Sequence, residues 1–203
     1  MFKKMAIKIT TILVDNNLIN IKEYHIYSYG FEVIIASFIN IIFALSLSLI
    51  FHKFIHVLIF LICYSSIRQF SGGYHANNHK SCIFIFLIIV LITIYASNYI
   101  NTVKHFPIII IFLLLNYFSI LFLAPLEHKN NPLSLDEKKR YSKISKLLAT
   151  IILFIVIISF VSRTKTDYTL FCLSALFWIN IMLILGNLQM RRDKNEQIFI
   201  KDT

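Results

Sequence analysis

The sequence predicts an all-α fold: a polytopic helical membrane protein with six transmembrane segments plus an N-terminal amphipathic helix. Of its 203 residues, 58% are hydrophobic and only 15% are charged, and the mean hydropathy is +0.73. Water-soluble domains contain about 45 to 50% apolar and about 25% charged residues. The apolar runs are continuous and lack the alternation typical of barrel strands, so they indicate helices.

Residues 1–28 are predicted to form a cytoplasmic amphipathic N-terminal helix. The apolar side chains of one face are Phe2, Met5, Ile9, Ile12 and Leu13. Lys3, Lys4 and Lys8 fall elsewhere, a pattern typical of a helix that lies on the anionic inner leaflet. No small-residue cleavage site follows, so a cleavable signal peptide is not indicated. The alternative is a frayed polar tail.

Six apolar runs approach the roughly 20 residues that a helix needs to cross a bilayer. They cover residues 30–51, 54–67, 83–100, 106–124, 147–162 and 168–188. No repeat period and no Gly-rich or Pro-rich linker divides them, so residues 29–190 are predicted to form one six-span membrane domain. Residues 191–203 are predicted to be a cytoplasmic tail.

The basic residues are distributed unevenly between the loops. With six spans, 16 of the 20 Lys and Arg residues fall on one side, and only Lys53, Lys104, Arg163 and Lys165 fall on the other. The positive-inside rule therefore predicts a multi-pass protein of the cell membrane with both termini cytoplasmic. The net charge of +10 is explained by this orientation, and no nucleic-acid partner is expected.

Polar residues begin at membrane depth after the short second run. Residues 54–67 would rise only about 21 Å as a helix, and residues 68–82 then form a predicted loop that contains Gly72, Gly73, His75 and Cys82. Irregular backbone at that depth is tolerated only inside protein or beside a wet cavity, which makes this loop a candidate functional site.

His75 and Cys82 are the candidate catalytic pair in this loop. On one straight helix they would lie about 10.5 Å apart along the axis, but Asn77 and Asn78 favour a turn that folds Cys82 back toward His75. An imidazolium beside a thiol stabilises the thiolate and can protonate a leaving amine. Arg68 and the helix N-terminus at Cys82 would add positive potential. The pattern is that of a cysteine peptidase site open to the cytoplasm.

Other interpretations of these residues stay open. His79 is a competing base, and a Cys and a His near one loop can also be incidental. A metal site of His75, His79 and Cys82 is disfavoured because no fourth ligand is evident and the surroundings are basic, so neither a metal nor a cofactor is expected. Cys63 and Cys172 lie inside apolar runs, where a thiol behaves as a small hydrophobe.

The run from Arg68 through Gly73 and His75 to Cys82 resembles the accessory gene regulator protein B (AgrB) family of membrane-embedded cysteine endopeptidases. The resemblance extends to the amphipathic N-terminus, to the Ala124–Pro125 pair and to the basic segment of Lys138, Lys139 and Arg140. It implies a peptidase domain whose catalytic loop is residues 68–82, with Cys82 as nucleophile and His75 as general base. Arg68 and Gly73 would shape the site.

The resemblance also implies a substrate and partners. The substrate would be the precursor of a quorum-sensing pheromone (AgrD-like), whose C-terminal tail is cleaved through a Cys82 thioester that allows macrocyclisation to a thiolactone or lactone. The basic loop 125–146, with Lys138, Lys139 and Arg140, would receive the tail, which is often acidic. The same charges would also be expected merely as inside-positive residues. The remaining partners implied are the lipid bilayer and a second copy of the chain in a homodimer.

Polar residues within the apolar runs have further candidate roles. Glu32 is predicted to shape the site by orienting His75 or pairing with Arg68, or else it reaches the interface. The amides Asn40, Asn116 and Asn180 are expected to hydrogen-bond between helices.

Two other function classes remain: a small transporter or exporter subunit without peptidase activity, and a structural membrane scaffold. A transporter would tolerate Cys82→Ser, whereas the peptidase would not.

Overall fold

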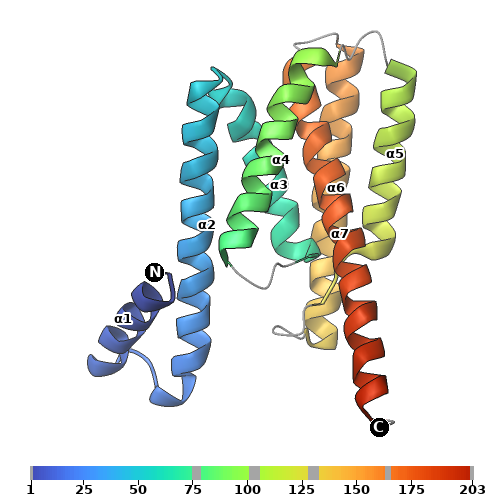
Figure 1. Cartoon of the computed structure of the whole chain (residues 1–203). Helices are drawn as coiled ribbons and strands as arrows, with labels where there is room; N and C mark the ends of the chain where they lie inside the picture. The colour runs from blue at the N-terminus through green and yellow to red at the C-terminus, as the bar shows by residue number, and fades with distance from the viewer. Residues whose placement is uncertain (1, 75–78, 101–105, 128–132, 163–165, 202–203) are drawn as a thin grey trace.

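The computed structural model of the chain describes residues 2–74, 79–100, 106–127, 133–162 and 166–201 (Figure 1). The described residues form seven α-helices and one short 3₁₀ helix, with no named strand, so the predicted all-α class is confirmed. The elements in order are α1 (Phe2–Asp15), η1 (Ile21–Glu23), α2 (Tyr24–Ile50), α3 (Phe54–Ser71), α4 (His79–Tyr99), α5 (Phe106–Leu123), α6 (Leu135–Val161) and α7 (Thr166–Lys201).

The helices have the lengths and composition of a multi-pass membrane protein. Within the described residues, five segments are long and apolar enough to cross a membrane: Ile21–Ile50, Phe54–Ser71, Ser81–Tyr99, Leu135–Val161 and Asp167–Arg192. The apolar segment Ile108–Leu123 of α5 is shorter. Five crossings are therefore supported, and a sixth crossing by α5 stays a prediction.

Helix α7 is the centre of the bundle, and α3, α4, α5 and α6 all pack against it (Figure 1). Its apolar window is 61% buried, against 17% for the first span. Phe171, Leu176 and Ile179 of α7 are among the fully buried side chains. Because α7 touches every helix that bounds the candidate site, it is the frame on which the site is built.

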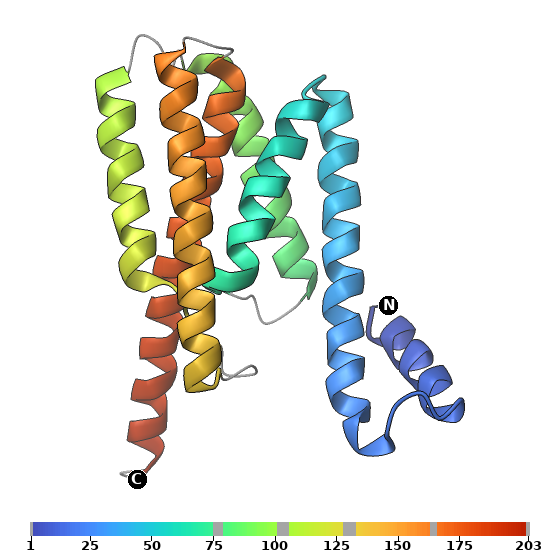
Figure 2. The ribbon, with the colours of Figure 1, turned by 180° about the vertical axis from the view of Figure 1, so that it is seen from behind.

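Helices α1 and α2 form the outer part of the molecule. Helix α2 packs on α1, α3 and α4, and seen from behind it stands at the edge of the bundle (Figure 2). The predicted N-terminal helix is confirmed and no frayed tail is observed, but the helix is shorter than residues 1–28, because α1 ends at Asp15 and α2 begins at Tyr24. Ala6 and Thr10 are its buried residues, whereas Met5 and Ile12 of the predicted apolar face are exposed. That face is therefore free to meet a membrane.

The ends of α3 and α4 differ from the sequence-based expectation. Helix α3 continues to Ser71 and spans 18 residues, so the prediction that the second run is too short is wrong. Arg68 is therefore helical, and α4 begins at His79, which narrows the predicted loop 68–82. The apolar count stopped at residue 67 because hydropathy ignores that Arg, Gln and Ser continue a helix at modest free-energy cost.

The basic segment is also helical. Helix α6 begins at Leu135, inside the predicted loop 125–146, and Ser134 and Glu137 form a capping box at its N-terminus. These two side chains satisfy backbone N–H groups that would otherwise lack partners. Helix α7 likewise continues to Lys201 through most of the segment predicted as a tail.

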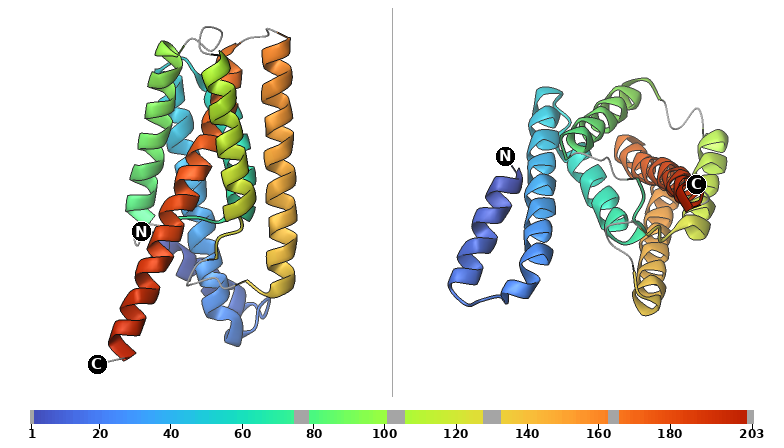
Figure 3. Two further views of the ribbon diagram at one scale, coloured as in Figure 1. Left: turned by 90° about the vertical axis from the view of Figure 1, so that its right-hand side faces the viewer. Right: turned by 60° about the horizontal axis from the view of Figure 1, so that its bottom comes forward.

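Helix α1 and the C-terminal end of α7 lie toward the same end of the molecule (Figure 3). The end of α3, the start of α4 and the start of α6 lie at that end as well (Figure 1). The side of the membrane that this end faces stays a prediction from the basic residues.

Candidate active site

Residues 72–74, here called the strap, leave the C-terminus of α3 in a conformation that only glycine adopts easily. Gly72 has φ +68° and Gly73 has φ +118°. The Gly72 N–H still donates to Arg68 O at 3.2 Å, which closes the last turn of α3. Without a Cβ, both residues can turn the chain sharply inward at no steric cost.

The strap is held between two other parts of the chain. On one side, the Leu126 N–H donates to Ser71 O at 2.8 Å, and Gly72 and Leu126 form an isolated β-bridge. On the other, the Tyr74 N–H donates to Met182 O of α7 at 2.7 Å. Backbone groups buried here have no water to bond, so these pairings satisfy them and fix the position of the strap.

Arg68 binds the strap through its side chain. Its guanidinium donates from Nη1 to Gly72 O and from Nη2 to Tyr74 O. Hydrogen bonds from a charged donor are stronger than neutral ones, and the fixed fork of the guanidinium suits two acceptors. Because both acceptors are neutral carbonyls, the positive charge of Arg68 is not cancelled by them.

Cys82 lies in the first turn of α4, half-buried and with a free thiol. It is close enough to Arg68 for a Coulombic interaction, and buried Tyr64 interacts electrostatically with both groups. The ring centroids of Tyr64 on α3 and Phe86 on α4 are 5.6 Å apart. Arg68 follows Tyr64 by one helical turn, and Cys82 precedes Phe86 by one helical turn. These two faces oppose each other, which brings the thiol to the guanidinium.

Burial of the thiol acts against a thiolate at Cys82, whereas two features of the site act in its favour. The N-terminus of a helix carries partial positive charge, and Arg68 adds a full positive charge nearby. The same two features would also stabilise an oxyanion that forms on a carbonyl carbon attacked by the sulfur. The arrangement is suited to nucleophilic chemistry by Cys82.

His75 lies outside the described residues, as do Asn77 and Asn78, so the proximity of His75 to Cys82 stays a prediction. Tyr74, the residue before His75, is anchored to α7 and to Arg68. Glu32 is half-buried on α2. Its role in orienting His75 or pairing with Arg68 stays a prediction.

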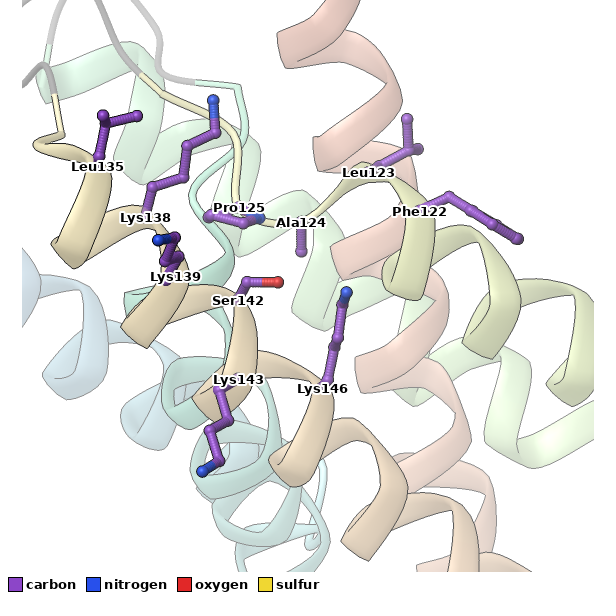
Figure 4. A pocket seen from close by; sticks show the side chains of 10 residues that line it. All are labelled: Phe122, Leu123, Ala124, Pro125, Leu135, Lys138, Lys139, Ser142, Lys143 and Lys146. Atoms are coloured by element: carbon purple, nitrogen blue, oxygen red, sulfur yellow. The ribbon is translucent and has the colours of Figure 1, made fainter.

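A cavity of about 780 Å³ lies beside the strap, between the end of α5 and the start of α6 (Figure 4). Its lining is Phe122, Leu123, Ala124, Pro125, Leu135, Lys138, Lys139, Ser142, Lys143 and Lys146. We call it the lysine cavity. Lys138 is paired with Glu127 at 2.9 Å, and the exposed Arg140 is not part of the lining. The cavity combines positive charge with apolar walls, which suits an anionic, partly apolar ligand.

Sequence reasoning missed four residues of this site: Tyr64, Leu126, Met182 and Gly186. Tyr64 has a readable signal, because it precedes Arg68 by one helical turn. Leu126 and Met182 bind through backbone atoms, and such bonds do not require a particular residue type, so the sequence does not reveal them. Gly186 of α7 lies against the backbone of Gly73 and Tyr74, and its position within an apolar run gives no indication of this contact.

Comparison with known proteins gives one family and several relatives. Residues 6–184 match the family described as Accessory gene regulator B. The chain is 32% identical to an AgrB-like protein of Clostridium perfringens strain SM101 over 71% of each chain. It is 29% identical to AgrB-like protein 2 of Clostridium perfringens strain 13, over 83% of this chain and 79% of that protein.

A more distant relative is accessory gene regulator protein B of Staphylococcus aureus strain bovine RF122 / ET3-1, which is 26% identical over 73% of this chain and 79% of its own length. No solved structure matches the chain. The matched region covers the strap, Cys82 and the lysine cavity, and it ends just before Gly186.

Proposed function

The chain belongs to the accessory gene regulator B family, and from this premise we propose that it is a membrane-embedded cysteine endopeptidase that processes a quorum-sensing pheromone precursor. Membership of the family supports a role in accessory gene regulator function and quorum-sensing processing. The peptidase chemistry, the nucleophile and the cytoplasmic position of both termini are the parts that we propose.

The observation that carries the proposal is the position of Cys82 beside Arg68. The thiol lies in the first turn of α4, and the Arg68 guanidinium interacts with it. The other two cysteines lie within α3 and α7, where their sulfurs face each other. Cys82 therefore has a guanidinium and a helix N-terminus nearby, two features that support a reactive thiolate against the effect of burial.

In the proposed reaction, the Cys82 thiolate attacks the carbonyl carbon at the C-terminal end of the pheromone segment. A bond forms between Sγ and that carbon, and the C–N bond then breaks. His75, as imidazolium, gives its proton to the leaving nitrogen of the tail. A Cys or Ser side chain within the bound peptide next displaces Sγ, which closes a thiolactone or lactone and regenerates the thiol. Exclusion of water at a site within protein and lipid would favour ring closure over hydrolysis.

The lysine cavity supports the assignment of an acidic tail to this end of the molecule. Lys138 and Lys139 line it, Lys143 and Lys146 add two further charges, and Pro125 in its wall precedes Leu126, which bonds the strap. A tail in the cavity would therefore lie close to the strap. Arg140 lies outside the lining, and we assign it the topogenic role. The homodimer that the family resemblance implies stays a prediction.

The test is co-expression of this protein with its precursor in membranes, with tail release followed by mass spectrometry. We expect Cys82→Ala and His75→Ala to abolish release while both variants remain folded. Cys63→Ala and Cys172→Ala are the matched controls and should retain it. Release by the Cys82→Ala variant would overturn the peptidase proposal and favour a transporter or scaffold.

A further inference from the structure

Three of the four glycines meet at the strap: Gly72, Gly73 and Gly186. Gly186 is buried on α7, four residues after Met182, whose carbonyl accepts the Tyr74 N–H. A Cβ built on Gly186 would lie 2.6 Å from Tyr74 N and 2.7 Å from Gly73 C. The strap therefore reaches α7 only because residue 186 has no side chain.

The atoms that such a Cβ would meet decide what has to move. Leu126 Cδ2, at 2.5 Å, is the end of a side chain and can rotate away. Tyr74 N and Gly73 C are backbone atoms, and Tyr74 cannot withdraw without loss of its bond to Met182 O. An alanine at 186 would thus push the strap off α7 while α7 itself, as a helix, gains propensity.

The strap and the Arg68 side chain are hydrogen-bonded to each other, so a shift of one displaces the other. Arg68 donates to Gly72 O and Tyr74 O, on both sides of Gly73, and a Cβ on Gly73 would meet the Arg68 guanidinium and Met182 O. A shift of Tyr74 away from α7 must therefore displace the guanidinium or break its bonds. The charge that acts on Cys82 depends in this way on the close approach at Gly186.

We infer that Gly186 is a positioning residue of the active site: by lacking a Cβ it seats the strap on α7 and so holds Arg68 beside Cys82. This inference rests on the proposed role of Cys82 as the nucleophile. Gly186 touches neither the sulfur nor the substrate, and it acts through Tyr74 and Arg68.

The test compares Gly186→Ala with Gly30→Ala in full-length protein. Gly30 is the matched control because a Cβ there meets nothing within 4 Å. We expect Gly186→Ala to slow alkylation of Cys82 by iodoacetamide about tenfold and to lower kcat for precursor cleavage by a similar factor, with KM little changed. Both rates are measured on the monodisperse folded fraction, so a loss of yield alone would not change them.

A double variant separates positioning from general damage. If Gly186 acts through Arg68, then Gly186→Ala should not slow alkylation further in an Arg68→Gln background. Equal slowing in both backgrounds, or wild-type rates for Gly186→Ala, would overturn the inference. If Gly186→Ala gives no folded protein, Tyr74→Pro removes the same donor with the sequence of α7 unchanged, and it must slow alkylation as well.

Failure of the proposed function would look different. Precursor cleavage by Cys82→Ala would remove the peptidase role whatever the glycine variants do. Conversely, loss of cleavage in Cys82→Ala together with unchanged rates in Gly186→Ala would leave the peptidase and remove only the role of Gly186.

Discussion

Cys63 Sγ lies 3.8 Å from Cys172 Sγ, where α3 packs against α7. Both thiols are free, and Cys172 is only 6% exposed. Each lies within an apolar span, away from the polar end of the bundle that holds the strap. Their setting agrees with the prediction that they act as small hydrophobes, whereas Cys82 lies in the first turn of α4, at the end of its span.

Selective labelling should follow from this difference. In the folded protein, a charged, membrane-impermeant maleimide reagent is expected to modify one cysteine per chain, and Cys82→Ala should reduce that number to zero. After denaturation in SDS the wild type should take three labels, because the chain has three cysteines. Intact-mass measurement gives the counts. Fast native labelling of Cys172 would contradict its burial, and fast labelling of Cys63 would contradict its position within the apolar span of α3.

Asn180 links α7 to α5 within the apolar layer. Its Nδ2 donates to Asn116 Oδ1 at 2.8 Å, and its Oδ1 accepts from Ser119 at 2.5 Å. Asn180→Ala removes both bonds and should lower the free energy of unfolding by about 0.5 to 1.5 kcal/mol, the usual range for bonds between membrane helices. Unfolding in mixed micelles with increasing SDS measures the change. Precursor cleavage by the folded variant should stay at the wild-type rate, since these side-chain bonds join α7 to α5 and not to the strap.

Arg68 has two roles that substitution can separate. Lysine retains the positive charge but cannot donate to Gly72 O and Tyr74 O in the fixed fork of a guanidinium. We therefore expect Arg68→Lys to lower kcat about tenfold and Arg68→Gln, which loses the charge as well, about a hundredfold. Single-turnover cleavage measures both. Equal activity of the two variants would show that charge at this position does not matter.

The sequence predicted those features that depend on residue type and periodicity. Apolar runs located the helices, the pattern of Met5, Ile9 and Ile12 located the N-terminal helix, and Asn116 and Asn180 were expected to bond between helices. The amide of Asn40 is the exception, because its buried Oδ1 has no partner in the described structure. Residues such as Arg68 and Cys82 stood out because polar groups are rare beside apolar runs.

The rest of the site could not be predicted because it is made of backbone contacts between distant segments. The bonds of Leu126 to Ser71 and of Tyr74 to Met182 use N–H and C=O groups that nearly every residue has. The importance of Gly186 depends on which backbone approaches it, and that is decided only when α7 packs against the strap. The capping box at Ser134 and Glu137 could be predicted from the spacing of Ser and Glu, but counting apolar residues does not detect it.

That capping box gives a stability prediction for the start of α6. Ser134→Ala removes the acceptor for the Glu137 N–H and should destabilise the first turn by about 1 kcal/mol. Hydrogen exchange of the backbone amides of residues 135–137 should become faster, while the buried part of α6 stays protected. Ser142→Ala, two turns further along the same helix, is the control and should change none of these rates.

The lysine cavity gives the sharpest test of how the substrate is recognised. Lys143 and Lys146 line it, whereas Arg140 lies on the same helix and outside it. For a precursor with an acidic tail, we expect the double variant Lys143→Gln and Lys146→Gln to raise KM about three- to tenfold with kcat unchanged. Arg140→Gln should raise KM less than twofold. The difference should shrink in about 0.5 M salt, where charges at the surface are strongly screened.

A precursor whose tail acids are replaced by amides separates the cavity from a general positive field. With this substrate the wild type and the double lysine variant should have the same KM, because the cavity no longer meets opposite charge. If Arg140→Gln instead raised KM as much as the double lysine variant, the tail would be attracted by the basic end of α6 as a whole. If neither variant changed KM, the tail would bind elsewhere, and the lysines would serve only to orient the chain in the membrane.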